Sequence, residues 1–176
     1  METIIQVKPK KNYFKRIYLA VMLWFTGRAV QAAARVDEDV RKEFGAMPDG
    51  YTFSLGAFPD GPYMVVGKDE AGIVHYLGWN LDRQRVDLQL TLKSVGLLFV
   101  LFTFAESTPV ANSRDRLFVS GDVPQACAAT RILDIVQVYL LPKFIAKMAI
   151  KRYPSWTFKR HTLDRLKVLV RALAGF

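Results

Sequence analysis

The sequence predicts an α+β fold in which helices cover one face of a mostly antiparallel sheet. Three observations lead to this prediction. Apolar residues recur at helical spacing near the N-terminus, alternate at strand spacing between residues 51 and 92, and return to helical spacing beyond residue 94. The 176 residues favour one domain with a sizeable core. With 51% hydrophobic and 23% charged residues, the composition excludes intrinsic disorder.

Residues 1–44 are predicted to form a basic, aromatic helical arm ahead of the main domain, which spans residues 45–176. The helix is expected from about Tyr13 to Phe44, and Gly27 is expected to kink or divide it. The segment 45–50 (Gly-Ala-Met-Pro-Asp-Gly) is a stop and loop signal. The apolar residues at helical spacing are Phe14, Ile17, Tyr18, Val21, Trp24 and Phe25.

Four strands separated by short turns are expected between residues 51 and 92. In the fourth and clearest, Val86, Leu88, Leu90 and Leu92 face one side while the intervening residues face the other. Short connections between successive strands imply an antiparallel meander with one apolar face. A fifth strand is predicted over residues 117–120.

Helical spacing returns after the fourth strand. Ser94 can cap a short, almost wholly apolar helix over residues 95–104, and a helix that is apolar all round is either buried or faces an apolar ligand. Asp122 can cap a longer helix that runs to about Leu141. Two amphipathic, basic helices are expected near the C-terminus, the last from about residue 162 to 173.

Several motifs follow one another in a characteristic order. They are the apolar strand 86–92, the apolar helix, the Thr-Pro-Val-Ala turn at 108–111, the strand 116–120 and the Gly-Asp helix start at 121–122. This order resembles the lipid-binding domains of the sterol carrier protein family, which are of the non-specific lipid-transfer type. The continuation over residues 132–143 is similar to a bacterial branch of that fold that assists ubiquinone synthesis.

The resemblance implies a five-stranded, mostly antiparallel sheet covered by helices that enclose an apolar cavity. It implies a long apolar ligand such as a fatty acid, phospholipid, sterol or isoprenoid quinone, and no chemistry by the protein itself. The long N-terminal helix departs from the family pattern. A dry core is the alternative interpretation of the same apolar cluster, but the resemblance favours a lipid-sized cavity. The candidate ligand-binding residues are Leu90, Leu98, Phe99, Leu101, Phe102, Leu133, Val136 and Leu140.

The net charge of +9 is concentrated at the two ends of the chain. Residues 1–35 hold seven Lys/Arg and one acid (+6), residues 142–176 hold nine and one (+8), and residues 36–141 hold nine and fourteen (−5). This asymmetry indicates a polyanionic partner, and basic residues beside bulky aromatics suit an anionic membrane surface. A solvated helix face is the plain alternative. Nucleic acid is a lesser one, since no recognition motif is present. The candidate membrane-binding residues are Lys11, Phe14, Lys15, Trp24, Phe25, Lys143, Phe144, Lys147 and Lys151.

Few residues suggest catalysis. The lone cysteine, Cys127, lies among alanines in a predicted helix and is interpreted as inert packing. His75 shares a strand face with Ile73, Leu77 and Trp79 and is interpreted as a core histidine. No phosphate-binding loop, nucleophile elbow or metal motif occurs in the sequence. We therefore predict no enzymatic activity, no cofactor and no metal, with a lipid-modifying enzyme that uses His75 as the alternative.

The predicted function is the non-catalytic binding of a long apolar lipid, with transfer or presentation of that lipid and peripheral docking to anionic membrane. The alternative is an accessory factor that presents isoprenoid quinone precursors to membrane enzymes. No uninterrupted apolar run approaches the ~20 residues of a membrane-spanning helix, and no signal-peptide cleavage site is apparent. The expected location is the cytoplasm, with peripheral association at the inner face of the membrane.

Overall fold

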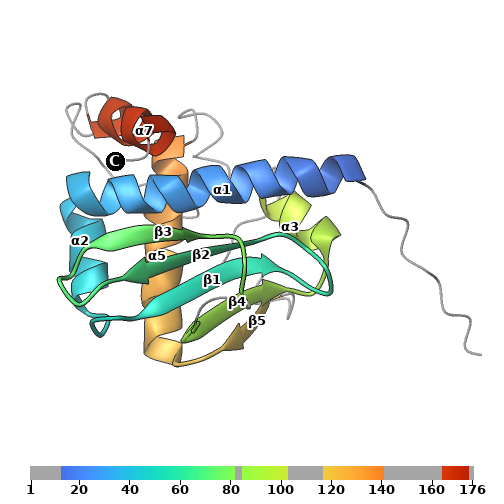
Figure 1. Ribbon diagram of the computed structural model, residues 1–176, viewed down its shortest axis with the longest axis horizontal. Coiled ribbons are helices and arrows are strands. Elements are labelled where there is room, and N and C mark those ends of the chain that lie inside the picture. Colours follow the sequence, from blue (N-terminus) through green and yellow to red (C-terminus); the bar gives the residue numbers. More distant parts are fainter. Residues whose placement is uncertain (1–12, 82–84, 103–116, 141–163, 175–176) are drawn as a thin grey trace, which may run out of the picture.

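The computed structural model describes residues 13–81, 85–102, 117–140 and 164–174 (Figure 1). The predicted α+β fold and five-stranded sheet are confirmed. The helices are α1 (Tyr13–Val36), α2 (Glu38–Gly45), α3 (Val95–Phe102), α5 (Val123–Leu140) and α7 (Arg165–Ala174). The strands are β1 (Thr52–Ala57), β2 (Tyr63–Lys68), β3 (Val74–Gly78), β4 (Leu88–Leu92) and β5 (Leu117–Ser120).

The sheet is mostly antiparallel, as predicted, but it is not a meander. Its strand order is β3-β2-β1-β4-β5, and β4 pairs with β1 in parallel while the other neighbours are antiparallel. The meander prediction was wrong because the chain after β3 does not turn tightly but crosses back to the far side of β1. Asp87 fixes this crossing, since its Oδ2 accepts hydrogen bonds from Thr52 N at 2.9 Å and Thr52 Oγ1 at 3.0 Å.

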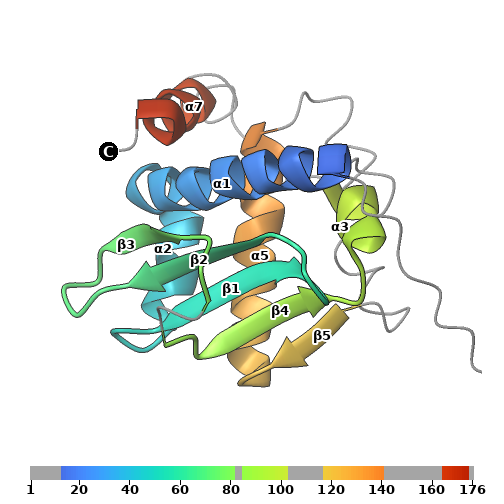
Figure 2. The same cartoon turned by 45° about the vertical axis from the view of Figure 1, so that its right-hand side comes forward.

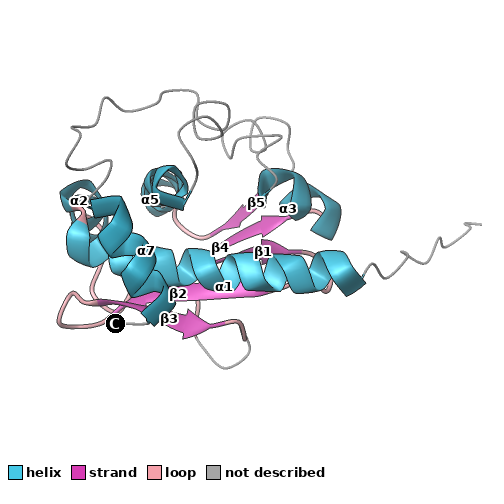
Figure 3. Cartoon of the chain, turned by 90° about the horizontal axis from the view of Figure 1, so that it is seen from above, coloured by secondary structure: helices cyan, strands magenta, loops and turns pink. Residues whose placement is uncertain are grey.

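The core lies between one face of the sheet and the helices. α5 passes behind the strands in Figure 1, α1 lies against β2 and β3, and α3 sits at the N-terminal end of α1. Seen from above, the helices line one side of the twisted sheet (Figure 3). Alternate strand residues such as Phe53, Leu55, Leu88, Leu90 and Leu92 face these helices and are at most 2% exposed.

The predicted N-terminal helix is divided, but at Asp37 rather than at Gly27. Asp37 has extended backbone (φ −98°, ψ 127°), and its side chain accepts from Asp39 N and Val40 N, so it caps a new helix. Gly27 does not divide α1, and glycine is required there because of packing. A Cβ placed there would stand 2.4 Å from Cδ2 of Tyr76, so glycine permits β3 to approach the helix.

α1 does not form a separate arm. Its buried residues, including Leu19, Leu23 and Val30, belong to the same core cluster as the strands, so the expected boundary at residue 45 is only the end of α2. α7 packs on the C-terminal half of α1, on the side away from the sheet (Figure 2). Arg28 joins the two helices by donating from Nε to the carbonyl of Ala172 at 3.1 Å.

α1 also bears on the question of a membrane span. Its 24 residues are long and apolar enough to cross a membrane by length and composition alone, which the run-length argument from the sequence overlooked. Half of the most apolar window is buried within the protein, and a core helix of a soluble protein passes the same test. α1 was the one such helix found in the described part of the chain.

Candidate lipid site and membrane surface

α3 is an eight-residue helix with no polar side chain. It begins after Ser94, whose Oγ accepts from Leu97 N at 3.2 Å. Leu98, Leu101 and Phe102 face inward and are at most 5% exposed, whereas Phe99 and its neighbours on the outer face are half-buried. α3 contacts α1, β1 and β4, so it closes one end of the space between the helices and the sheet.

The structure brings all eight predicted ligand-binding residues into one cluster. Six are at most 5% exposed, and Phe99 and Leu140 are partly buried against the same cluster. Leu90, Leu98 and Val136 have no accessible surface at all, so the cluster is closed to water around them. A lipid between α3, α5 and β4 therefore requires a change in how these elements pack.

Beside α3, the N-terminal half of α1 carries large apolar residues on its surface. Tyr13, Phe14, Ile17 and Val21 are 66%, 84%, 65% and 56% exposed, and we call these four residues the outer stripe. Tyr13, Ile17 and Val21 are spaced four residues apart and so lie on one helix face. Of these four residues, only Phe14 was predicted from the sequence to bind membrane, because a surface stripe and a core stripe have the same spacing.

Phe99 lies where α3 meets the N-terminal half of α1. Its ring meets the ring of Tyr18 edge to face, with 5.6 Å between centroids. The Nζ of Lys15 stands 5.1 Å from the centre of the same ring. A cation and two aromatic rings thus occupy the junction between the two helices.

The other predicted membrane-binding residues divide into two groups. Phe25 packs against the core cluster, and Trp24 is half-buried with the Arg28 guanidinium 5.4 Å from its ring centre, so neither belongs to the outer stripe. The remaining five lie outside the described residues and are Lys11, Lys143, Phe144, Lys147 and Lys151.

Two interpretations of potentially reactive residues were wrong. Cys127 is exposed on α5 rather than packed, because only its alanine neighbours face inward. His75 is half-exposed rather than in the core, and its Nε2 lies 2.9 Å from Oδ2 of Asp69. Backbone hydrogen bonds from Ile73 first, and then the bond to His75, lower the pKa of Asp69. Among the described residues, no group of three His, Cys, Asp or Glu side chains could hold a metal ion.

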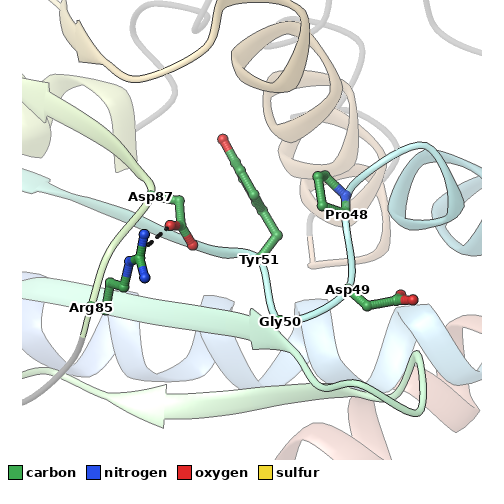
Figure 4. Close-up of a pocket in the computed structure, with 6 residues that line it drawn as sticks. All are labelled: Pro48, Asp49, Gly50, Tyr51, Arg85 and Asp87. Atoms are coloured by element: carbon green, nitrogen blue, oxygen red, sulfur yellow. Dashed lines mark ion pairs between the residues drawn. The ribbon is translucent and has the colours of Figure 1, made fainter.

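A polar pocket of about 380 Å³ lies at the start of β1 and β4 (Figure 4). Two of its residues, Asp87 and Arg85, already interact with other side chains or backbone atoms. Asp87 bonds Thr52 across the parallel pair, and Arg85 Nε stands 3.7 Å from the Asp87 carboxylate. Tyr51 lines the pocket with a buried hydroxyl that has no hydrogen-bond partner among the described residues. Burial first, and then Asp87, raises the pKa of this phenol. The lining residues are Pro48, Asp49, Gly50, Tyr51, Arg85 and Asp87.

Asp134 is a residue whose environment sequence reasoning missed. It is the one acidic residue within α5, and burial raises the pKa of its carboxyl to about 6. It follows Leu133 directly, so a titratable group stands beside the apolar cluster. An acid between Leu133 and Ile135, in the apolar stretch of α5, was the signal that could have revealed it.

Several solved structures are similar to this chain. The ubiquinone synthesis protein UbiJ-SCP2 shares 11% identity, with 70% of this chain and 98% of that chain covered and a TM-score of 0.44. Sterol Carrier Protein 2 from Yarrowia lipolytica shares 16% identity, covering 69% and 94%, with a TM-score of 0.47. Sterol carrier protein domain 2 of Helicoverpa armigera shares 16%, covering 74% and 94%, with a TM-score of 0.43.

These structures bear the name of the family that the sequence resembles. No protein-family model and no curated protein matches the sequence. Because the TM-scores lie below 0.5, we base the proposed function on this chain's own residues.

Proposed function

We propose that this protein binds a long apolar lipid between α3, α5 and the sheet, and that it docks on anionic membrane through the outer stripe. Two observations carry the proposal: the all-apolar helix α3 contacts α1 through Phe99 and Tyr18, and the same half of α1 exposes the outer stripe. Docking brings α3 to the bilayer, and movement of α3 admits the lipid. The protein then acts as a carrier, without chemistry of its own, at the cytoplasmic face of the membrane.

The charge distribution supports the choice of an anionic membrane. Lys15 lies in the same turns of α1 as the outer stripe, and the ends of the chain carry the excess positive charge. Each basic residue near an anionic surface contributes ~1 kcal/mol, and this contribution is screened by salt. Burial of the outer stripe is not screened. The two contributions therefore predict binding that weakens, but is not lost, at high salt.

Liposome co-sedimentation tests the docking step. Replacing Ile17 and Val21 with serine should weaken binding to anionic vesicles about thirtyfold, since two partly inserted side chains contribute about 2 kcal/mol together. Val123→Ser is the matched control, because Val123 is 67% exposed at the start of α5, away from the outer stripe. Equal binding by the control and the double variant would contradict the proposed docking surface.

Native mass spectrometry of the purified protein tests the lipid site. The wild type should retain a lipid, and Val136→Phe, which adds bulk where α5 and the sheet must separate to admit it, should lose it. Circular dichroism establishes that the variant is folded, since overpacking typically costs ~1–3 kcal/mol. Lipid occupancy that is unchanged in the folded variant would place the ligand elsewhere.

The proposed movement of α3 is tested by a substitution at Gly96, an exposed glycine in this helix. A Cβ at this position meets only Ser94 Oγ at 3.6 Å, so alanine fits and stabilises the helix by about 0.5–1 kcal/mol. Gly96→Ala should therefore slow lipid exchange between vesicles while leaving vesicle binding unchanged. An unchanged or faster exchange rate would exclude movement of α3 as the step that admits lipid.

A second candidate is the presentation of isoprenoid quinone precursors to membrane enzymes. The sequence resemblance over residues 132–143 supports it. Mass spectrometry of the extracted lipid separates the two candidates. A polyprenylated aromatic compound favours presentation, whereas phospholipid or fatty acid favours general transfer.

A further inference from the structure

A second pocket lies at the other end of α1, between the α1–α2 corner and the β2–β3 hairpin. Its volume is about 480 Å³, within the ~300–1,000 Å³ typical of small-molecule sites. α3 and the outer stripe lie at the opposite end of α1 (Figure 1). The residues that line the pocket are Ala34, Arg35, Arg41, Phe44, Gly45, Lys68, Gly72, Ile73 and Val74.

The floor of this pocket is apolar. Ala34, Phe44 and Val74 are 7%, 3% and 5% exposed, so they present only a little surface, and that surface faces the pocket. Ile73 is 46% exposed and forms an apolar edge on the hairpin. A ligand that covers these four side chains removes apolar surface from water, which favours an aliphatic group.

The rim carries three cations. The Nη1 of Arg41 donates to the carbonyl of Arg35 at 3.1 Å, which holds the guanidinium over the end of α1. Lys68 is occupied, because its Nζ lies 2.7 Å from Asp49 Oδ1 and donates to the carbonyl of Met47. The remaining guanidinium donors of Arg35 and Arg41 suit a planar carboxylate, which an arginine can bind through two hydrogen bonds.

Asp69, a carboxylate on the β2–β3 hairpin, has hydrogen-bond partners of its own. Asp69 accepts from Ala71 N at 3.0 Å and Ile73 N at 2.7 Å, and its other oxygen lies 2.9 Å from His75 Nε2. The Asp69 carboxylate is therefore oriented toward its own turn, where both of its oxygens have partners. The charge at the pocket is positive on balance, above an apolar floor.

We propose that this pocket binds a single-chain amphiphile with a carboxylate head group, its chain on the floor and its head group on Arg35 and Arg41. This site is independent of the lipid site under α3. It requires neither movement of α3 nor docking on a membrane, so either proposal can fail while the other stands.

The test uses the full chain and decanoate below its micelle concentration, followed by heteronuclear NMR. Decanoate should shift the amide signals of Gly45, Gly72 and Ile73 in a saturable way. Decanol and decyltrimethylammonium have the same chain without the negative charge and should bind at least about tenfold more weakly. Equal affinity for all three, or shifts confined to α3, would overturn the proposal.

The second measurement compares the Kd for decanoate among variants at exposed residues. Arg41→Gln should raise the Kd for decanoate about tenfold, and Ile73→Asp, which places a carboxylate at the apolar edge, should abolish binding. The matched control is Lys42→Gln, because Lys42 is exposed on α2 but does not line the pocket. If Lys42→Gln weakens binding as much as Arg41→Gln, the effect is general electrostatics and the site is refuted.

Discussion

The two halves of α1 differ in how much of their apolar surface the rest of the protein covers. In the N-terminal half, large apolar residues such as Phe14 and Ile17 are more than half exposed. In the C-terminal half the residues are small, yet Ala29, Ala32 and Ala33 are at most 1% exposed. Small side chains allow the sheet, α5 and α7 to approach the helix closely. The hydrophobicity of a helix segment therefore does not show whether the segment is buried, and the exposed half is the one available to a partner.

The largest expected effect comes from enlarging a small residue in the covered half. In Gly27→Leu the new Cβ would stand 2.4 Å from the Tyr76 ring, so β3 must shift away from α1. We expect a loss of about 3 kcal/mol or more in the free energy of unfolding, measured by urea denaturation. Val21→Leu in the exposed half is the control and should change stability by less than ~0.5 kcal/mol. Similar losses in both variants would remove the distinction between the two halves.

The end of the covered half depends on a buried carboxylate. Asp37 is 3% exposed, caps α2 through Asp39 N and Val40 N, and accepts a hydrogen bond from the hydroxyl of Tyr139. Asp37→Ala should cost about 2–3 kcal/mol, because a helix cap and a buried hydrogen bond are lost together. Combining it with Tyr139→Phe in a double-mutant cycle measures the coupling between the two side chains. Strictly additive losses would mean that the bond from Tyr139 contributes nothing.

Asp134 extends the comparison to α5, which packs under the covered half. Burial raises the pKa of its carboxyl from 3.8 to about 6, so the folded state binds a proton more tightly than the unfolded state. Stability is therefore lost as the pH rises from about 4 through 6, and the charged form costs up to about 3 kcal/mol above that range.

Asp134→Asn should thus be the more stable protein at pH 8, by about 1–2 kcal/mol, with little difference from the wild type at pH 4. Thermal unfolding of the two proteins across this pH range measures the effect. The same difference at both pH values would show that titration of Asp134 is not its cause.

The smallest expected effect on stability belongs to the exposed half. Ile17→Ser and Val21→Ser remove apolar side chains that are 65% and 56% exposed, so each should change the free energy of unfolding by less than about 0.5 kcal/mol. The variant that combines Ile17→Ser and Val21→Ser is also the one expected to bind anionic vesicles more weakly. A large loss of stability in solution would indicate that these residues are already covered by another part of the chain.

Local patterns predicted much of this fold. Alternation from Val86 to Leu92 located β4, the apolar run after Ser94 located α3, and the Gly-Asp pair at 121–122 marked the start of α5. Each of these signals acts within a few residues, through pleating, capping or backbone conformation. The eight ligand-site candidates all lie in or against the hydrophobic core, and their role in binding lipid stays a prediction.

Features that depend on distant neighbours were not predictable in the same way. The parallel pairing of β4 with β1 depends on a crossing that turn signals do not encode. The exposure of Cys127 and His75 depends on which face of α5 and β3 is covered. The role of Gly27 depends on Tyr76, which approaches from a different element. The second pocket needs the α2 corner and a hairpin to meet, which no local pattern shows.

The parallel pairing at the centre of the sheet also has a consequence for synthesis. β2 follows β1 after a short turn, so one edge of β1 is paired almost as soon as it emerges from the ribosome. The other edge waits for β4, whose residue Asp87 meets Thr52 across 35 positions of chain. Contacts between such distant residues form late, and an unpaired strand edge is a template for association with other chains. Translational pausing before residue 92 would therefore lengthen the period in which β1 invites aggregation, and a chaperone that binds residues 52–57 would protect the nascent protein.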